Sequence, residues 1–561
     1  GGKSGSNDWH VNSIGNTGYT YILKEDGTVS SLGYNVNGEL GNGAKVSTTA
    51  VQEVSNLTEI MQVAGSKNGN FGAAVKEDGT VWTWGANTNG QLGNGTTDSP
   101  KLNAIQVGSS GSNAMRITHG SVTNQDTGIQ RVEFNNELIT NVLIAENEEF
   151  HIFEDGISLN QSFSLLPDSQ EVKAGSVEYT SFNPNIATVG KYTGIVTPVK
   201  GIYGTAIILV KSDGYSSIIR VSIKPQDTDD VKSVAKPMVA TGASHTIALK
   251  YDGTVWTWGN NTNGQLGNNS TENSSSPVQV KSADGNGYLT NIIEISAGSD
   301  HNMALRNDGT VWTWGSNTYG QLGNGSSVNS MLPVQVKSAD GNSFLTDIVQ
   351  ISAGYVHSMA LKKDGTVLAW GRNDGGQLGN NNTSNKSLPV QVKGGASGSE
   401  YLTDVVQVTA GNWHSMALKA NGTVYAWGWG QYGQLGNGYT TNSDDTDKYS
   451  YEKIYSAPVQ VLNGAQTSET GYLKEVVQID AMGGTGHNDR NRFGTSLAVT
   501  ESKEVYGWGN SWYGALGVKS SIVSKPVRVA TDISNAVQVA GGGKSGSDDW
   551  HVNSIGNTGY T

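Results

Sequence analysis

The feature that most constrains the fold is a segment that recurs along almost the whole chain. Its clearest copies are TVWTWGNNTNGQLGN at Thr254–Asn268, TVWTWGSNTYGQLGN at Thr310–Asn324 and TVWTWGANTNGQLGN at Thr80–Asn94. Four looser copies lie at Thr28–Asn42, Thr366–Asn380, Thr423–Asn437 and Val505–Gly517. The alternation in VWTWG predicts a short strand with one buried face, and the Asn/Gly run predicts a turn. Seven copies of one strand–turn unit therefore predict a repeat fold.

The repeat unit contains three further strand-like segments in a fixed order. In the unit Val405–Val461 the expected strands are Val405–Gly411, His414–Gly422, Thr423–Gly428 and Pro458–Val461. Four short strands joined by turns are typical of one blade of a β-propeller. The fourth strand is expected to begin at its proline, at an outer edge where one backbone donor can be spared.

The repeat resembles a known family. The pattern V-x-x-V-A-x-G-x-x-H-S-x-A-L-x-x-D-G-x-V-x-x-W-G-x-N-x-x-G-Q-L-G is that of the regulator of chromosome condensation repeat, and Ile293–Gly323 is similar to it nearly throughout. The resemblance implies an all-β, seven-bladed propeller with four-stranded blades. Blades 1 and 7 depart most: Leu32 replaces the second tryptophan in blade 1, and a long loop, Gly483–Gly494, interrupts blade 7.

An insertion separates blades 2 and 3. Within it, Ser181–Val210 resembles bacterial Ig-like domains of group 2 through S-x-N-P-x-x-A-T-V, G-x-V-T and G-x-A-x-I, which implies a β-sandwich over about Leu159–Lys224. The acidic Glu146–Asp155 is expected to be a solvated hairpin rather than a metal site. The predicted organisation is propeller blades 1–2, inserted Ig-like module, propeller blades 3–7 and a terminal duplicate, at residues 1–107, 108–236, 237–540 and 541–561.

The two ends of the chain carry the same sequence. Gly542–Thr561 repeats Gly1–Thr20 except that Asp548 stands where the first copy has Asn7. Val537–Ala540 fits the first-strand pattern that the N-terminus lacks. Either the C-terminal copy closes the ring by completing blade 1, or the segment begins a further module in a tandem array. Two copies of one segment also permit exchange between molecules, and hence end-to-end assembly.

Composition excludes several classes of protein. The net charge is −13 and no cluster of Lys and Arg is visible, so nucleic acid is not an expected partner. No apolar run is long enough to insert into a membrane. The absence of cysteine excludes disulfides without deciding the compartment. With no metal-binding His/Cys spacing, no G-x-S-x-G and no P-loop, we expect no enzyme activity, cofactor or metal.

Histidine and tryptophan recur at fixed positions of the repeat, and each has two interpretations. His245, His301, His357 and His414 occupy one repeat position, which would suit either a metal ring or a repeated hydrogen bond to the backbone of the same blade. Blades 1, 2 and 7 lack the motif, so we favour the structural role. The paired tryptophans suit sugar binding or blade packing. We favour packing for the second tryptophan of each pair and its equivalents, Trp84, Trp258, Trp314, Trp370, Trp427 and Trp508.

Candidate binding residues lie in two loops of each blade, one before the repeat histidine and one after the WG pair. Exposed aromatic residues and arginine in such loops are typical of protein interfaces. The candidates are Tyr355, Arg372, Trp413, Trp429, Tyr432, Trp512, Tyr513 and Trp550. The alternative is that each aromatic residue only covers a neighbouring turn.

The sequence is compatible with three functions. The first is a non-enzymatic bacterial extracellular or cell-surface protein, used for adhesion or as a building block of a surface fibre. Its partner would be a further copy of itself or a surface receptor, and carbohydrate is a further candidate. The second is a soluble protein-binding or inhibitory module that uses one face. The third, which the acidic charge disfavours, is a GTPase exchange factor.

Overall fold

The computed structural model describes most of the repeat region and part of the insertion. The described residues are 18–24, 26–66, 69–76, 79–108, 141–145, 150–151, 178–181, 187–191, 195–198, 204–212, 215–224, 235, 237–250, 252–395, 400–439, 454–464, 471–485, 492–502, 504–511, 515–518, 522–529 and 536–542. Every regular element in these residues is a β-strand.

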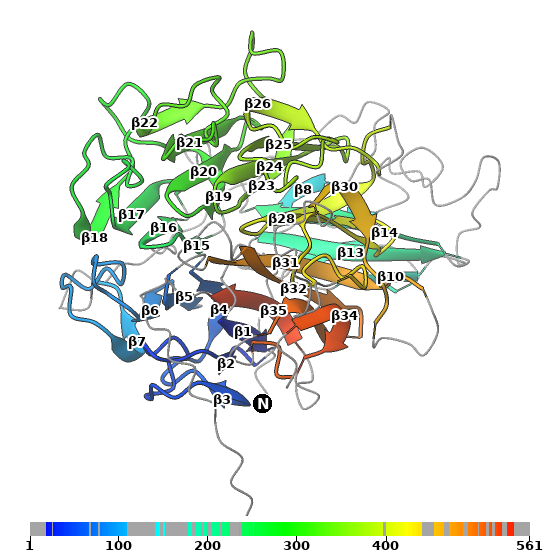
Figure 1. Cartoon of the computed structure of the whole chain (residues 1–561), viewed down its shortest axis with the longest axis horizontal. Helices are drawn as coiled ribbons and strands as arrows, with labels where there is room; N and C mark the ends of the chain where they lie inside the picture. The colour runs from blue at the N-terminus through cyan, green and yellow to red at the C-terminus, as the bar shows by residue number, and fades with distance from the viewer. Residues whose placement is uncertain are drawn as a thin grey trace, which may run out of the picture.

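Seven four-stranded antiparallel sheets surround a common centre (Figure 1). Each sheet runs from an inner strand to an outer strand, and the sheets follow one another around the ring in chain order. The predicted all-β propeller of seven four-stranded blades is therefore confirmed.

The strands of the first four blades are as follows. Blade 1 contains β35 (Ala536–Gly542), β1 (Tyr19–Lys24), β2 (Val29–Gly33) and β3 (Thr48–Glu53). Blade 2 contains β4 (Ile60–Gly65), β5 (Phe71–Lys76), β6 (Val81–Gly85) and β7 (Lys101–Gln106). Blade 3 contains β15 (Met238–Thr241), β16 (His245–Leu249), β17 (Val255–Gly259) and β18 (Ser274–Gln279). Blade 4 contains β19 (Ile292–Ala297), β20 (His301–Arg306), β21 (Val311–Gly315) and β22 (Ser330–Gln335).

The remaining blades repeat the same order. Blade 5 contains β23 (Ile348–Ala353), β24 (His357–Lys362), β25 (Val367–Gly371) and β26 (Lys386–Gln391). Blade 6 contains β27 (Val405–Ala410), β28 (His414–Lys419), β29 (Val424–Trp429) and β30 (Ile454–Gln460). Blade 7 contains β31 (Val476–Thr485), β32 (Arg492–Thr500), β33 (Val505–Asn510) and β34 (Ile522–Arg528).

The outer strand begins earlier than predicted. In blade 3, Pro277 was expected to start the strand, but β18 starts at Ser274. Its pairing with β17 shifts register between Thr257 and Gly259, so that Thr257 faces Val278 and Gly259 faces Ser274. The proline lies within this irregular stretch of an outer edge strand, where a missing N–H breaks no ladder bond.

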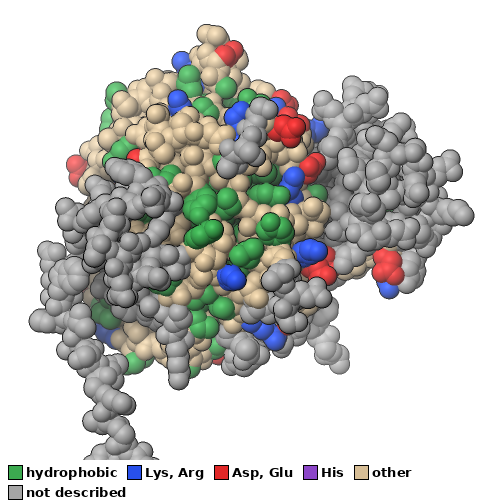
Figure 2. Space-filling model, turned by 45° about the vertical axis from the view of Figure 1, so that its right-hand side comes forward, with side chains coloured by type: hydrophobic (Ala, Val, Ile, Leu, Met, Phe, Trp, Pro, Cys, Tyr) green, Lys and Arg blue, Asp and Glu red, His purple; other side chains and the backbone are tan. Residues whose placement is uncertain are grey.

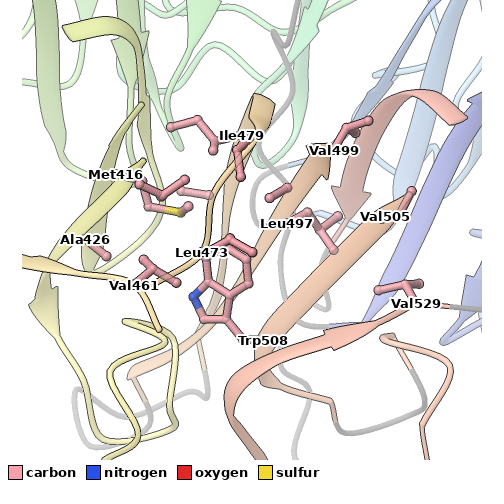
Figure 3. Close-up of a cluster of buried hydrophobic side chains, with 14 of the residues drawn as sticks. Met416, Ala426, Val461, Leu473, Ile479, Leu497, Val499, Val505, Trp508 and Val529 are labelled. Carbon is pink, nitrogen blue, oxygen red and sulfur yellow. The ribbon is translucent and has the colours of Figure 1, made fainter. Parts of the chain in front are cut away.

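The hydrophobic core lies between neighbouring blades. Figure 3 shows Met416 and Ala426 of blade 6 on one side of such a layer and Leu497 and Trp508 of blade 7 on the other, and these side chains belong to one buried cluster. Because each blade has two buried faces, its strands are apolar on both sides, and every blade depends on its neighbours for stability.

Side chains also join the innermost strands around the centre. An innermost strand is a sheet edge, so part of its row of N–H groups has no partner within its own blade. The preceding blade supplies acceptors: the Val408 N–H donates to Gln350 Oε1 at 2.9 Å, and the Ile479 N–H to Gln407 Oε1 at 3.0 Å. The repeated Gln of the first strand therefore holds adjacent blades together.

Blade 1 combines both ends of the described chain. β35 pairs antiparallel with β1, with Tyr19 opposite Gly542 and Tyr21 opposite Ala540. The C-terminal segment thus supplies the inner strand, as the pattern at Val537–Ala540 suggested, while the second strand begins with Tyr19 and Thr20 of the N-terminal copy. The ring is closed by strand pairing, without a covalent link between the two ends.

The strands between blades 2 and 3 form sheets of their own. β10 (Glu178–Ser181), β13 (Gly204–Ser212), β14 (Tyr215–Lys224) and β8 (Asn141–Ala145) form one sheet, in which β8 runs parallel to β14. β11 (Ala187–Val189), β12 (Ile195–Pro198) and β9 (Phe150–His151) form a second sheet. Side chains are buried in both sheets, among them Tyr179, Ala187, Val196, Ile208 and Val221.

Candidate interaction face and the histidine relay

The propeller has two faces with different loops. The loop before each repeat histidine and the loop after each WG pair share one face, here called the loop face, because they are hydrogen-bonded: the Ser316 N–H donates to the Asp300 carbonyl at 2.8 Å. The Asp-Gly turns and the hairpins that connect successive blades share the opposite face, here called the hairpin face. There the Ile348 N–H donates to the Gly309 carbonyl at 3.2 Å.

Each repeat histidine is fully buried and joins its blade to the next one. His357 Nε2 lies 3.0 Å from Ser415 Oγ of blade 6. The Ser415 hydroxyl donates to the Gln377 carbonyl of blade 5 at 2.8 Å, so it accepts from the histidine, which fixes the proton on Nε2. The same arrangement joins His301 to Ser358, His414 to Ser496 and His245 to Asn302.

The second tryptophan completes this contact, which we call the histidine relay. Trp427 Nε1 donates to the same Gln377 carbonyl at 2.9 Å, and the side chain is fully buried. Equivalent bonds from Trp84, Trp258, Trp314, Trp370 and Trp508 reach the loop of the preceding blade. In blades 1 to 6, one loop carbonyl therefore anchors the tryptophan of the following blade.

The relay corrects one expectation and explains a repeated glycine. We expected each histidine to bond the backbone of its own blade, but its partner is a side chain of the next blade. The His357 imidazole packs against Gly354, the residue that follows the inner strand of the same blade. A Cβ at this position would lie only 2.3 Å from His357 Cε1, so the repeat has glycine here. The ring therefore faces the neighbouring blade.

Burial lowers the pKa of two of the relay histidines and favours their neutral form. Burial lowers the pKa of His414 to about 3, and burial is also the largest cause of the lowered pKa of His245. Within the described parts of the chain, no group of three or more His, Cys, Asp or Glu side chains could hold a metal ion. The acidic segment Glu146–Asp155 lies mostly outside the described residues.

The loop face carries one cluster of aromatic and charged side chains, here called the Arg372 cluster. The Arg372 guanidinium lies between two rings, 4.6 Å from the centre of Tyr319 and 4.3 Å from that of Trp413. It also donates to both oxygens of Asp374, at 2.7 and 2.9 Å. Tyr355 lies 6.4 Å from Trp413. Loops from blades 4, 5 and 6 thus meet at one arginine.

The centre of this cluster is buried, contrary to the expected exposure. Trp413 is 2% exposed, and Arg372 and Trp429 are each 9% exposed. Stacking and the paired carboxylate occupy most of the arginine surface, while Trp429 Nε1 donates to Gln431 Oε1 at 3.2 Å. Tyr319, Tyr355 and Tyr432 are half-buried, and burial raises the pKa of Tyr432. The accessible aromatic surface of this cluster therefore comes from the half-buried tyrosines and not from Trp413 or Trp429.

Not every candidate residue can be placed. Trp512, Tyr513 and Trp550 lie outside the described residues. Tyr319 was missed although it occupies the repeat position of two candidates, Tyr432 and Tyr513; that position is Asn in three other copies and Gly in a fourth. That variation inside an otherwise constant segment was the available signal.

The face seen in Figure 2 carries charges of both signs. Figure 2 shows apolar side chains gathered near the middle of one view, with Lys, Arg, Asp and Glu scattered around them and no histidine on the described surface of that view. None of the described residues forms a helix with the length and apolarity that crossing a bilayer requires.

The fold and the histidine relay define a repeat propeller whose blades are joined by one recurring set of contacts. A family model described as the RCC1-like domain matches residues 216–546, and a model of the regulator of chromosome condensation (RCC1) repeat matches residues 78–119. The first match spans more than half of the chain. This protein belongs to the RCC1-like domain family.

Relatives and solved structures agree with this assignment. The chain is 30% identical to the ultraviolet-B receptor UVR8 of Arabidopsis thaliana over 336 residues, which are 54% of this chain and 72% of the receptor. It is 30% identical to human E3 ubiquitin-protein ligase HERC2 over 296 residues, 52% of this chain but only 5% of that ligase.

Two solved structures share the fold at low sequence identity. Prp20p of Saccharomyces cerevisiae is similar with a TM-score of 0.53 and 16% identity, over 95% of this chain and 91% of that one. Human WBSCR16 is similar with a TM-score of 0.50 and 15% identity, over 94% and 97%.

Proposed function

We propose that this chain is a non-enzymatic binding protein that takes a protein partner on its loop face. The observation that carries the proposal is the Arg372 cluster, in which a stacked and paired arginine is surrounded by half-buried tyrosine edges. Tyrosine, tryptophan and arginine supply most interface hot spots. Rings that are already ordered lose little conformational entropy when a partner binds.

The chemistry of the rim suggests the kind of partner. Asp300 and Asp374 are partly exposed on the same face as Tyr319 and Tyr355. A partner that places Lys or Arg beside these carboxylates, and apolar groups on the tyrosine edges, would match the face. One similar propeller binds proteins: Prp20p, the yeast RCC1, was studied for its binding to Gsp1p and histones and was solved bound by Kap60.

The test compares two tyrosines on opposite faces. The full chain is cross-linked in an extract of its source cells, and captured proteins are identified and re-tested in purified form. Tyr355→Ala should reduce binding of the purified partner by about tenfold or more, because it removes a hot-spot ring. Tyr288→Ala, on the hairpin face, is the matched control and should bind normally. If both variants bind the partner equally well, the loop face is not the binding surface.

A second candidate role rests on the ends of the chain. Blade 1 is closed only by pairing of β35 with β1, and Gly542–Thr561 repeats the segment that leads into β1. A second molecule could therefore supply the next strand of blade 1, which would join copies end to end. The resemblance of Leu159–Lys224 to bacterial Ig-like modules supports an extracellular or cell-surface location, with adhesion or fibre formation as the role.

Sedimentation tests this second role. The full chain should form larger species as its concentration rises, whereas a chain ending at residue 542, which keeps β35 and lacks the rest of the duplicate, should remain a monomer. A full chain that stays monomeric at the highest concentration would exclude assembly and leave the protein-binding proposal unaffected. Substrate turnover by the purified chain would overturn both proposals.

A further inference from the structure

In blades 3 to 6, the hairpin that leads to the next blade exposes one aromatic side chain. Four of these rings are about half-exposed, and they occupy the same repeat position in blades 3 to 6. The residues, with their exposed fractions, are Tyr288 (54%), Phe344 (52%), Tyr401 (46%) and Tyr472 (48%). Each forms an isolated backbone bridge with the second residue after the outer strand, namely Lys281, Lys337, Lys393 and Leu462. We call these four rings the hairpin row.

The backbone of each hairpin is held without help from the ring. The residue after each aromatic is a buried leucine, for example Leu289 and Leu345. The Leu289 N–H donates to the Val280 carbonyl at 3.0 Å, and the Leu345 N–H to the Val336 carbonyl at 2.9 Å. With leucine facing the core, alternation turns the aromatic outward. Stability therefore does not explain why an exposed ring recurs in four blades.

A second set of rings lies on the same face. The first residue of each tryptophan pair is half-buried beside the Asp-Gly turn: Trp256 Nε1 donates to Thr254 Oγ1 at 3.3 Å, and Trp312 Nε1 to Thr310 Oγ1 at 3.3 Å. In blade 6 the equivalent residue is Tyr425, whose pKa is raised by burial and, to a smaller degree, by the nearby Tyr472. Blades 3, 4 and 6 thus carry two partly accessible rings each on the hairpin face.

The insertion leaves the propeller at the same hairpin of blade 2. The Gly108 N–H donates to the Gly93 carbonyl at 3.2 Å, and the Lys281 N–H makes the equivalent bond to the Gly267 carbonyl at 3.0 Å. Residue 108 therefore corresponds to the first residue of the blade 3 hairpin, and the chain next enters the propeller at β15. The inserted segment replaces this hairpin, and the hairpin row begins in the following blade.

We propose that the hairpin row, with Trp256, Trp312 and Tyr425 beside it, binds a linear, uncharged polysaccharide. The flat faces of pyranose rings carry C–H groups that stack on aromatic rings, while their hydroxyl groups bond to side chains such as Ser282, Asp284 and Asn286 of the exposed hairpin. One ring in each blade is a repeated site, and a repeating ligand occupies such sites together. A protein hot spot instead needs a contiguous cluster.

Charge favours an uncharged polymer over an acidic one. The chain carries a net charge of −13, which repels polyanions. One of the three lysines that are bridged to the row stacks on its partner ring: Lys393 Nζ lies 4.2 Å above the centre of Tyr401. This surface is opposite the Arg372 cluster, so it is independent of the proposed protein-binding function.

Affinity electrophoresis of the full chain tests the proposal. Native gels contain hydroxyethyl cellulose, xylan or dextran, and binding to insoluble chitin and cellulose is measured by pull-down. At least one of these neutral polysaccharides should retard or retain the wild-type chain. Tyr288→Ala or Phe344→Ala should weaken binding by about twofold to fivefold, and the fourfold variant Y288A/F344A/Y401A/Y472A by about 100-fold, because linked weak sites multiply.

The controls separate binding from folding and from self-association. Tyr439→Ala removes a 64% exposed tyrosine in a loop after a WG pair, and should bind like the wild type. The fourfold variant should keep the wild-type melting temperature, because its rings are exposed. Absence of binding to every polysaccharide, or equal binding by the wild type and the fourfold variant, would overturn the proposal. A fourfold variant that changes only the sedimentation of the chain would identify the row as a contact between copies, and would overturn it too.

Discussion

The joint between blades 5 and 6 and the seam between blades 7 and 1 connect equivalent blades in different ways. At the joint, His357 bonds Ser415, and both Ser415 and Trp427 donate to the Gln377 carbonyl. Closer to the centre, Gln350 accepts from the Val408 N–H. Side chains and backbone groups of the two blades therefore bond to one another at several points of the joint.

At the seam the strands occupy equivalent positions, but the described residues make fewer of these hydrogen bonds. Thr495 stands at the histidine position and donates to the Asn510 carbonyl of its own blade at 2.6 Å. Leu32 stands at the tryptophan position, so no indole N–H is present. Gln478, the counterpart of Gln407, is buried, and neither atom of its amide has a hydrogen-bond partner among the described residues. Across the seam, the Thr20 hydroxyl donates to the Ala515 carbonyl at 2.6 Å.

The difference indicates where the ring opens. Ile22 and Leu32 of blade 1 are fully buried in one cluster with side chains of blade 7, so apolar packing contributes at the seam too, and the hydrogen bonds distinguish it from the joint. Blade 1 is moreover the one blade built from both ends of the described chain. Opening at the seam therefore breaks fewer bonds and leaves the other blades in contact.

The largest expected effect comes from removing the closing strand. A chain ending at residue 535 lacks β35, so β1 becomes an open edge whose N–H groups have lost their partners. We expect the loss of a single cooperative unfolding transition, a lower melting temperature and aggregation, measured by calorimetry and light scattering. A chain ending at residue 542 is the matched control and should melt like the full chain. Equal melting of both truncated chains would show that the seam does not hold the ring.

The second largest effect is expected at the tryptophan position, which Trp427 occupies at the joint between blades 5 and 6 and Leu32 occupies at the seam. Trp427→Ala should reduce the free energy of unfolding by about 3–5 kcal/mol, through loss of a fully buried indole. The lost bond to Gln377 adds about 1 kcal/mol. Leu32→Ala at the seam should cost less, because it removes a smaller side chain and no hydrogen bond. Guanidinium unfolding of both variants measures the difference, and a larger loss for Leu32→Ala would contradict our view of the seam.

Acid should weaken the joints and spare the seam. The pKa of His414 is about 3 in the folded chain and about 6.5 in an unfolded one, so only the unfolded state takes up a proton between these values. The histidine contribution is complete above about pH 6.5. It falls by about 1.4 kcal/mol for each pH unit below that, toward pH 3.

A pH series of unfolding measurements tests this expectation. The difference in unfolding free energy between the wild type and His414→Gln should be largest at pH 7.5 and should shrink as the pH falls to 4. Thr495 does not titrate, so Thr495→Ser at the seam should show a pH-independent difference. A wild-type advantage over His414→Gln that stays constant from pH 7.5 to 4 would exclude the relay as the acid-sensitive element.

The fold was predictable because its information is local and repeated. The VWTWG alternation and the Asn/Gly turn define one strand and one loop, and repetition fixes the number of blades. What could not be predicted is contact between blades. Nothing in the residues around His357 indicates that its partner is Ser415, because that choice depends on how two separate blades face each other.

The candidate site was predictable only in part. Arg372 and Trp413 were both candidate residues, but their contact and their burial were missed, because the stacking of one on the other joins loops of different blades. The hairpin row was missed although its signal is in the sequence: an aromatic residue followed by leucine recurs after each PVQV segment of blades 3 and 4.

The smallest expected effect is a difference between two glutamine substitutions, of which one should destabilise the fold and the other should be neutral or stabilising. At the joint between blades 6 and 7, the Gln407 amide both accepts from the Ile479 N–H and donates to its carbonyl, at 3.0 and 3.1 Å. Gln407→Met keeps the volume but leaves both backbone groups buried without a partner, which should cost about 1–3 kcal/mol. Gln478→Met at the seam removes an amide that already lacks partners among the described residues, so it should be neutral or stabilising by up to about 1 kcal/mol. Urea unfolding of the two variants decides between them. Equal destabilisation would mean that Gln478 is as well bonded in solution as Gln407, and that the seam is no weaker than the other joints.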